Sequence, residues 1–188
     1  MRYRRYITNR YKRYIYPAII NKCVMFAGSQ GGHFTELMGL KSLFPLYESV
    51  LVTDNLKATK DIPELSSFKY IAYSKAWAIH RQKTAGITTT RSRWQNAWTY
   101  FKMFLECFKI YRKYKPSVVI STGSYIAVPL FISAKLRGAK TIFIESNAKV
   151  YSKTTTGILV ERLSDKIYVQ WPEMLKLYPR AEYYGVLS

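Results

Sequence analysis

Short apolar runs without polar alternation recur along this chain, and few folds can accommodate them. A strand that alternates apolar and polar residues has one wet face, whereas a continuous apolar strand is covered on both faces, as in a parallel sheet. From residue 22 onward these runs alternate with helical patterns. We therefore predict an α/β fold, a Rossmann-like parallel sheet with helices on both faces. The predicted strands are residues 23–27, 49–53, 68–73, 118–120, 141–144, 167–171 and 183–187.

Helical periodicity fills most of the gaps between these strands. The predicted helices run from Glu36 to about Phe44, from Trp94 to Lys115, from Ala127 to Leu136, from Thr156 onward and from Pro172 to Tyr178. A length of 188 residues suits one well-buried domain and is too short for two large ones. We predict a basic segment at residues 1–21 followed by a single domain at residues 22–188.

The sequence holds few residues that could bind a transition metal. Its cysteines are Cys23 and Cys107, and its histidines are His33 and His80. The cysteines have no metal-binding spacing and suit a reducing compartment. So few ligands argue against zinc chemistry, and we expect neither a metal nor a cofactor.

Positive charge is concentrated in two stretches of the chain. The formal net charge is +19. Residues 1–22 contain seven cations and no acid, and residues 69–115 contain Glu106 as their only acid. Such a charge distribution seeks polyanions, and the two obvious candidates are nucleic acid and an anionic membrane surface.

The N-terminal segment combines its cations with a helical stripe of Tyr and Ile. A basic helix with an aromatic apolar face suits the headgroup region of a membrane. It cannot span a bilayer, because Pro17, Asn21 and Lys22 interrupt its only apolar run. A disordered basic arm is the alternative. The residues predicted to meet the membrane here are Arg4, Arg5, Tyr11 and Arg13.

A second aromatic and basic stretch precedes and enters the long predicted helix. One face of this helix is apolar, and packing on the sheet explains most of it. The aromatic rings among the cations also resemble an exposed membrane patch. We therefore expect the side of the helix that faces the sheet to join the core and the opposite side to contact the membrane. The residues predicted to meet the membrane in this stretch are Trp77, Trp94, Trp98 and Phe101.

A glycine-rich turn, residues 28–36, links the first strand to the first helix. Glycines let backbone N–H groups approach a ligand, and a helix start adds partial positive charge, so a phosphate or diphosphate is the expected guest. His33-Phe34 replaces the Lys-Ser/Thr of a Walker loop, and Gln30 stands where a dinucleotide fingerprint needs glycine. An ATPase or an NAD enzyme is therefore disfavoured. The alternative is a turn that only connects strand and helix.

Two further strand ends carry small and polar residues. They are Ser121-Thr122-Gly123-Ser124 and Glu145-Ser146-Asn147. Ligands of open parallel sheets bind at the carboxyl ends of the strands. The convergence of three such ends is a stronger signal than any single turn. The predicted site contains Gly28, Gly31, Gly32, Thr35, Thr122, Gly123, Ser124, Glu145 and Asn147.

Several segments resemble one known family, in the same order along the chain. They are residues 28–36, 120–123, 143–146, 169–173, 178–181 and 185–187. The family is the membrane-anchoring subunit of the two-part N-acetylglucosaminyltransferase of asparagine-linked glycosylation, with bacterial relatives in capsule and exopolysaccharide synthesis. More distantly, the chain is similar to the acceptor half of the lipid I N-acetylglucosaminyltransferase of peptidoglycan synthesis. The second turn has one glycine where that relative has more, and eukaryotic members usually have a transmembrane anchor.

The resemblance implies the N-terminal, acceptor half of a GT-B glycosyltransferase. The UDP-sugar would be bound by a separate small partner chain, without which this subunit would be inactive. The acceptor would be a polyprenyl-diphosphate-linked saccharide at the cytoplasmic face of the cell membrane. The site residues would receive its diphosphate, and Glu145 or Asn147 would orient its hydroxyl groups. The partner is expected near the C-terminal strand, at Trp171, Tyr184, Val186 and Leu187.

His33 is the candidate base for the attacking hydroxyl group, because imidazole titrates in a useful range. A role in capping the helix or binding phosphate fits the sequence equally well. Glu36 is expected to complement the helix dipole.

Two other functions remain open at this stage. The chain could be a complete small glycosyltransferase that binds donor and acceptor in the same loops. It could also be a nucleic-acid-binding protein that uses its cations and aromatic rings. The sequence contains no recognised nucleic-acid-binding module, so we expect no nucleic acid as a partner.

Overall fold

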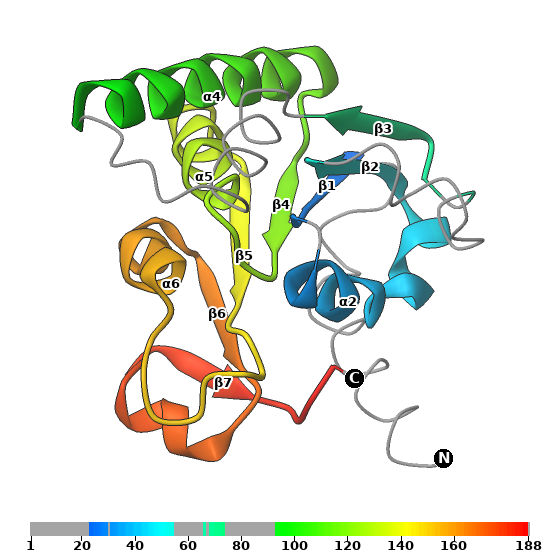
Figure 1. The fold of residues 1–188 in the computed structure, drawn as a ribbon. Helices are drawn as coiled ribbons and strands as arrows, with labels where there is room; N and C mark the ends of the chain where they lie inside the picture. The colour runs from blue at the N-terminus through cyan, green and yellow to red at the C-terminus, as the bar shows by residue number, and fades with distance from the viewer. Residues whose placement is uncertain (1–22, 30, 55–65, 67, 74–92, 188) are drawn as a thin grey trace.

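The computed structural model describes residues 23–29, 31–54, 66, 68–73 and 93–187 (Figure 1). The predictions for residues 1–22, for Trp77 and for the side chain of Trp94 lie outside the described part. The strands are β1 (Cys23–Ala27), β2 (Glu48–Thr53), β3 (Tyr70–Tyr73), β4 (Val118–Ser121), β5 (Lys140–Ile144), β6 (Lys166–Val169) and β7 (Ala181–Tyr183). The helices are α2 (Gly32–Met38), α4 (Arg93–Tyr114), α5 (Ala127–Leu136) and α6 (Thr155–Val160), with 3₁₀ helices at Lys41–Leu46, Glu161–Leu163 and Pro172–Lys176.

The strands form one parallel sheet with the order β3-β2-β1-β4-β5-β6-β7. The chain starts in the middle, builds outward to β3, and then returns to β4 on the other side of β1. This order is that of a doubly wound fold, whose switch point lies between β1 and β4. The predicted Rossmann-like α/β fold is confirmed.

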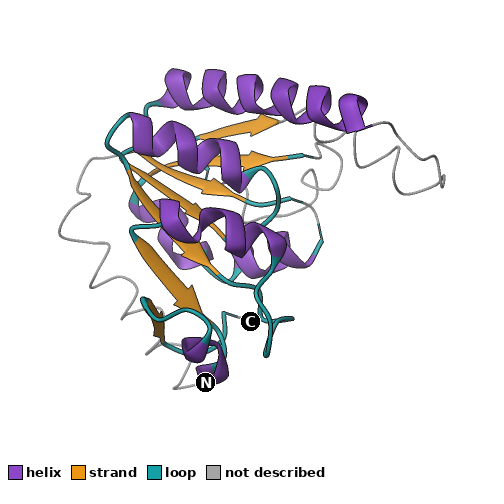
Figure 2. Ribbon diagram, turned by 90° about the vertical axis from the view of Figure 1, so that its left-hand side faces the viewer, coloured by secondary structure: helices purple, strands orange, loops and turns teal. Residues whose placement is uncertain are grey.

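Helices cover both faces of this sheet (Figure 2). Helices α4, α5 and α6 lie on one face, where α5 contacts both of the others. Helix α2 and the 3₁₀ helix at Lys41–Leu46 lie on the opposite face. The predicted arrangement of helices on both faces is therefore confirmed.

The continuous apolar run of strand β1 is explained by cores on both faces of the sheet. Met25 and Ala27 enter the core beneath α4 and α5, while Val24 and Phe26 enter the core beneath α2. The ring centroid of Phe26 lies 4.9 Å from that of Phe44, in an edge-to-face contact. Full burial of each large apolar side chain stabilises the fold by about 1.5–3 kcal/mol. Both faces of the strand thus need apolar residues.

The first helix ends earlier than its sequence pattern predicts. It was predicted to continue to about Phe44, but α2 stops at Met38 and a 3₁₀ helix follows. Gly39 stands at the end of α2, where a Cβ atom would lie 2.1 Å from the carbonyl oxygen of Leu187. The C-terminal segment therefore lies directly against the end of this helix.

The last predicted strand also differs from the observed one. Strand β7 covers residues 181–183, not 183–187, and the chain then leaves the sheet. The N–H group of Leu187 donates to Gln170 Oε1 at 2.8 Å, and the Leu187 side chain, 6% exposed, joins the core beneath α2. The apolar residue at position 187 is thus explained by its packing in the core beneath α2.

Within the part of the chain that the structure covers, no helix combines the length and the hydropathy that a membrane span needs. Helix α4 has 22 residues, but polar and charged side chains recur along it.

Candidate functional site

The loops that follow β1, β4 and β5 meet at the carboxyl edge of the sheet. Strand β4 pairs with both β1 and β5, so their ends are neighbours. The glycine-rich turn follows β1, residues 122–124 follow β4, and residues 145–147 follow β5. The structure thus brings together segments that are about a hundred residues apart in the sequence, as the hydrogen bonds below show.

His33 and Thr122 tie the first two loops together through a reciprocal pair of hydrogen bonds. The Thr122 hydroxyl donates to the His33 carbonyl oxygen at 2.6 Å, and His33 Nδ1 lies 3.0 Å from the Thr122 carbonyl oxygen. A carbonyl oxygen only accepts, so Nδ1 must carry the hydrogen. In the neutral ring, Nε2 is then the basic nitrogen, and the side chain is 32% exposed.

Gly123 makes room for this imidazole ring. A Cβ atom at Gly123 would lie 2.6 Å from both Cε1 and Nδ1 of His33, and the residue has φ +128°. Ser124 follows with φ +76°, which is uncommon for a residue with a side chain. Its buried Oγ has no hydrogen-bond partner in the part of the chain that the structure describes. The turn after β4 therefore packs against the His33 ring, and this packing explains why the turn has glycine at position 123.

Glu36 is a buried carboxylate beside the histidine. Its Oε1 accepts from the Ser146 hydroxyl at 2.8 Å and from the Asn147 N–H at 2.9 Å. Its Oε2 is buried, has no hydrogen-bond partner among the described residues, and lies 4.0 Å from His33 Nδ1. Burial raises the pKa of Glu36, against the opposing effect of the hydrogen bonds from Ser146 and Asn147.

The structure corrects the role expected for Glu36. The side chain lies in the second turn of α2 and points into the protein, so complementing the helix dipole does not account for it. It instead connects α2 to the loop after β5 and faces His33.

Glu145 is 1% exposed and is satisfied within the protein. Its Oε1 accepts from the Ser146 N–H at 2.9 Å, and its Oε2 accepts from the Thr154 N–H at 3.1 Å and the Tyr178 hydroxyl at 2.5 Å. Glycine is needed at position 157 for this contact, because a Cβ atom there would lie 2.1 Å from the Tyr178 hydroxyl oxygen. The Glu145 carboxylate thus anchors the loop from inside and does not reach the surface.

Asn147 is half-buried at the tip of the same loop. Its carbonyl oxygen accepts from Trp171 Nε1 at 2.6 Å, and its N–H donates to Glu36. Both backbone groups of Asn147 are therefore held by hydrogen bonds. Trp171, predicted as a partner contact, lies next to the site through this bond.

The predicted phosphate-binding residues of the first turn differ in exposure. Gly28 is buried, and a Cβ atom there would lie 3.2 Å from Leu37 Cδ2, so this glycine is needed for packing. Gly31, Gly32 and Thr35 are exposed. Gly31 has φ +105° and begins α2, whose first N–H groups have no acceptor within the helix.

Two other predicted surfaces are the membrane contacts on α4 and the partner contacts near the C-terminus. Trp98 and Phe101 are 58% and 50% exposed on α4, their rings stack at 5.6 Å, and Lys102 Nζ lies 5.5 Å from the Trp98 ring. Among the residues predicted to contact a partner, Tyr184 and Val186 are half-buried, whereas Leu187 is buried.

Sequence reasoning missed the residues that support the site from below. Gln170 joins the Glu145 carbonyl oxygen to the C-terminal segment, and Tyr178 and Gly157 enclose the Glu145 carboxylate. A glycine inside a helical pattern, as at Gly157, is a signal that could have indicated close packing. Among the described residues, no group of three or more His, Cys, Asp or Glu side chains could hold a metal ion.

Comparison with protein families gives a match over nearly the whole described chain. Residues 23–187 match the family described as "Oligosaccharide biosynthesis protein Alg14 like".

Relatives with names are found in fungi, animals and bacteria. The chain is 26% identical over 190 residues to the UDP-N-acetylglucosamine transferase subunit ALG14 of Yarrowia lipolytica, covering 96% of this chain and 88% of the relative. It is 28% identical to the human protein of the same name, covering 86% and 81%. A shorter match, 35% identical over 74 residues, is to a UDP-N-acetylglucosamine--N-acetylmuramyl-(pentapeptide) pyrophosphoryl-undecaprenol N-acetylglucosamine transferase of Chlorobaculum parvum, covering 39% of this chain and 20% of that protein.

Solved structures share the fold at low identity. MurG of Acinetobacter baumannii matches 89% of this chain with a TM-score of 0.65 and 13% identity. The UDP-GlcNAc 2-epimerase of Methanocaldococcus jannaschii matches 87% with a TM-score of 0.58 and 12% identity. This chain spans 46% and 45% of those two chains, so it corresponds to about half of each.

Proposed function

The chain belongs to the Alg14-like family of oligosaccharide biosynthesis proteins, and from this premise we propose that it is an accessory subunit of a UDP-sugar glycosyltransferase. In this proposal the subunit binds a polyprenyl-diphosphate-linked saccharide acceptor and completes the active site of a separate chain that binds the UDP-sugar. The relatives that it matches over most of their length are named as subunits of a UDP-N-acetylglucosamine transferase. The pathway would be the synthesis of capsule, exopolysaccharide or lipid-linked oligosaccharide.

The observation that carries the proposal is the meeting of three loops around His33 at the β1/β4 switch point. Open parallel sheets bind ligands at this position. The exposed Gly31 and Gly32 offer backbone N–H groups at the start of α2, and Thr35 lies one turn on. A diphosphate needs several donors in a small space, and these groups would supply them. Thr122, Gly123 and Ser124 support the site from the side of β4 by holding the histidine.

His33 would act as the base in the transfer step. The acceptor hydroxyl oxygen attacks the anomeric carbon of the donor sugar, the bond to the UDP oxygen breaks, and UDP leaves with the electron pair. The hydroxyl proton passes to His33 Nε2, because Nδ1 is already bonded to the Thr122 carbonyl oxygen. Glu36, 4.0 Å from Nδ1, would favour the cationic ring that results.

The other predicted ligand contacts divide into direct and indirect ones. Asn147 is half-buried in the loop after β5, next to the site, and would orient the acceptor hydroxyl groups. Glu145 is buried and bonded within the protein, so it would act through the position of Asn147 and not by contact.

We assign the membrane contact to the exposed rings of α4, Trp98 and Phe101, with Lys102 beside them. Such a pair of aromatic rings next to a cation suits the interface of an anionic bilayer. The subunit would thus bind peripherally at the cytoplasmic face of the membrane. The partner chain would dock near Trp171, Tyr184 and Val186, while buried Leu187 would hold the C-terminal segment in place.

A transfer assay tests this proposal. The purified chain is incubated with a radiolabelled UDP-sugar and a polyprenyl-diphosphate-linked saccharide, alone and together with the product of its neighbouring reading frame. We expect product only in the mixture, and we expect His33→Ala to abolish it. Transfer by the chain alone would instead establish a complete small glycosyltransferase.

A second assay separates the membrane from nucleic acid as the polyanion. Flotation with anionic vesicles is compared with retention of an oligonucleotide at physiological salt. We expect the chain to float with the vesicles. Oligonucleotide retention without vesicle binding would contradict the proposed location.

A further inference from the structure

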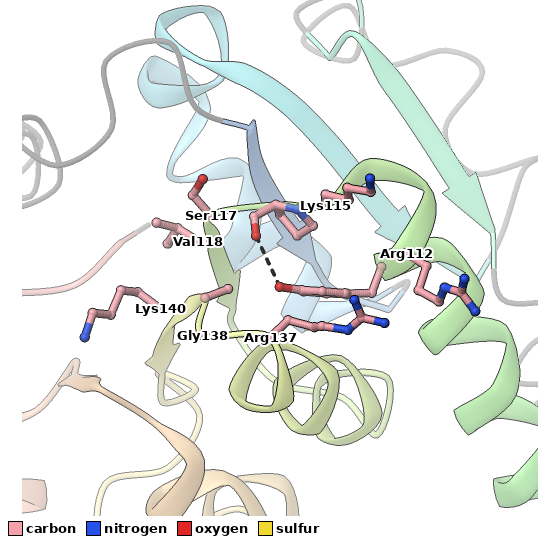
Figure 3. Close-up of a pocket in the computed structure, with 10 residues that line it drawn as sticks. Arg112, Lys115, Ser117, Val118, Arg137, Gly138 and Lys140 are labelled. Carbon is pink, nitrogen blue, oxygen red and sulfur yellow. Dashed lines mark hydrogen bonds between the residues drawn. The ribbon is translucent and has the colours of Figure 1, made fainter.

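A basic cavity lies at the edge of the sheet opposite to the candidate site. Its volume is about 730 Å³, and its lining includes Arg112, Lys115, Arg137 and Lys140 but no acidic residue. Figure 3 shows these side chains around the cavity, together with Ser117 and Gly138. Four cations around one hollow repel one another, and a bound anion would relieve that repulsion.

The fold brings these cations together from three elements. Arg112 lies in the last turn of α4 and Lys115 just after it, Arg137 follows α5, and Lys140 begins β5. Both helices end at this edge, where β4 and β5 begin. In a parallel sheet this is the amino edge, away from the glycine-rich turn, so the cavity is separate from the candidate site.

Helix ends alone do not account for the cluster. A cation near the C-terminus of a helix is favourable, which would explain Arg112 and Arg137 one by one. It does not explain Lys140 at the start of a strand, nor the absence of acids from the lining. Lys115, moreover, has φ +45°, an uncommon conformation for a residue with a side chain.

Nearby carboxylates do not neutralise the cavity. Asp165 Oδ1 lies 3.7 Å from Lys140 Nζ, but it lies closer, at 2.8 Å, to Lys135 Nζ. Within the described part of the chain, Arg112, Lys115 and Arg137 make no ion pair with a carboxylate. Glu48, Glu161 and Glu182 are each paired with other lysines.

We propose that this cavity binds a phosphate-bearing anion, with Arg112 and Arg137 as the main contacts. The guanidinium group presents a planar set of donors that matches two oxygens of a phosphate. Lys115 and Lys140 add charge at the rim. The cavity wall is held by the buried Tyr111, whose hydroxyl donates to the Pro116 carbonyl oxygen at 3.3 Å (Figure 3).

The start of β1 lies at the same edge of the sheet. The Ser117 N–H donates to the carbonyl oxygen of Cys23 at 2.9 Å, so Cys23 lies next to the cavity lining. The basic residues 1–22 precede Cys23 in the sequence. The anion could therefore be a soluble phosphate compound or the phosphate of an acidic lipid headgroup, since both present the same chemistry.

Binding experiments with the full chain test the site and distinguish the two sources. The variant Arg112→Ala/Arg137→Ala is compared with the control Lys109→Ala/Lys176→Ala, which removes the same charge at exposed positions outside the cavity. One arm titrates inorganic phosphate and follows the ³¹P resonance. The other arm measures partition onto vesicles of phosphatidylcholine with phosphatidic acid. Circular dichroism checks that all variants are folded.

We expect the arginine variant to lose about tenfold or more in affinity in one arm, since charge-assisted bidentate bonds are lost, while the control stays near the wild type. The arm that responds identifies the source of the phosphate. If both variants weaken binding to the same extent in both arms, net charge alone is responsible and the site is disproved. If neither variant weakens binding, the cavity does not bind phosphate and the site is likewise disproved. The result does not depend on the transfer reaction proposed above.

Discussion

The two ring nitrogens of His33 have different roles: Nδ1 forms a hydrogen bond within the protein, and Nε2 is the nitrogen proposed to accept the proton in the transfer step. Nδ1 faces the Thr122 carbonyl oxygen and, at 4.0 Å, a buried carboxylate oxygen of Glu36. No described residue forms a hydrogen bond with Nε2, so this nitrogen can take a proton. The residue-scale predictions concern the two positions that create this arrangement, Glu36 and Gly123.

Replacing Glu36 with Gln should make folding stability depend less on pH. The pKa of Glu36 is raised on folding, chiefly by burial, so the folded state holds its proton more tightly than the unfolded one. The carboxyl group therefore lowers the free energy of unfolding as pH rises from near its ordinary pKa, 4.5, through the raised value. Gln can still accept from Ser146 and Asn147.

Urea denaturation of both proteins between acid and neutral pH measures this effect. We expect the stability of Glu36→Gln relative to the wild type to increase with pH across that range, while transfer activity falls because His33 loses its anionic neighbour. A pH-independent difference in stability would mean that the buried carboxyl group is not strained by its site.

Replacing Gly123 with Ala should displace His33. The new Cβ atom would lie 2.6 Å from the imidazole ring, in addition to the cost of φ +128°. Gly138→Ala is a matched control, since it has φ +73° but no atom within 4 Å of the added Cβ. The backbone strain alone costs about 1–2 kcal/mol.

Chemical denaturation and the transfer assay together read out this pair. We expect both variants to be destabilised, with Gly123→Ala affected more, and only Gly123→Ala to lose transfer activity. Equal activity in the two variants would show that the position of the ring does not matter.

At the scale of elements, sequence patterns predicted the strands better than the loops. Met25 and Phe26 pack on opposite faces, and their continuous apolar run already indicated a strand covered on both sides. The carboxyl ends of β1, β2, β3 and β5 were also predicted correctly, whereas β4 ends one residue later and β6 two residues earlier than predicted. The ends of α2 and β7 were wrong, since they depend on the contact between Gly39 and Leu187.

The inward-pointing acids could not be predicted from the sequence. Glu36 was expected to complement the helix dipole and Glu145 to orient acceptor hydroxyl groups, and neither role requires a side chain buried within the protein. Their burial depends on Ser146 and Tyr178, which are 110 and 33 residues away from them. Such pairing follows from the register of the strands, and no local pattern records it.

Helix α4 exposes the stacked rings of Trp98 and Phe101, which we propose contact the membrane. Trp98→Ser/Phe101→Ser should weaken partition onto anionic vesicles by about tenfold or more, since each substitution removes a large apolar ring from the contact with the membrane interface. Leu136→Ser is the control, because Leu136 is 70% exposed at the end of α5. Vesicle sedimentation measures both. Equal loss in the two variants would place the membrane contact elsewhere.

At the scale of the whole molecule, the two edges of one sheet carry two different kinds of site. The carboxyl edge holds glycine loops, a histidine and buried carboxylates, and the amino edge holds a hollow lined by arginine and lysine. The central claim concerns the carboxyl edge, where the acceptor diphosphate, and not the nucleotide, would bind.

Gly32 gives the most direct test of that claim. Among the described residues, and apart from its chain neighbours and the backbone of α2 itself, nothing lies within 4 Å of a Cβ atom at this position. A carboxylate in the first turn of α2 is compatible with the helix. Gly32→Asp should therefore fold and yet repel a diphosphate, while Gly32→Ala serves as its neutral control. Calorimetric titration of the full chain compares a short-chain polyprenyl-diphosphate-linked saccharide with UDP-N-acetylglucosamine. We predict that the wild type and Gly32→Ala bind the lipid-linked saccharide and not the nucleotide sugar, and that Gly32→Asp binds neither; undiminished binding by Gly32→Asp, or binding of the nucleotide sugar by the wild type, would contradict the claim.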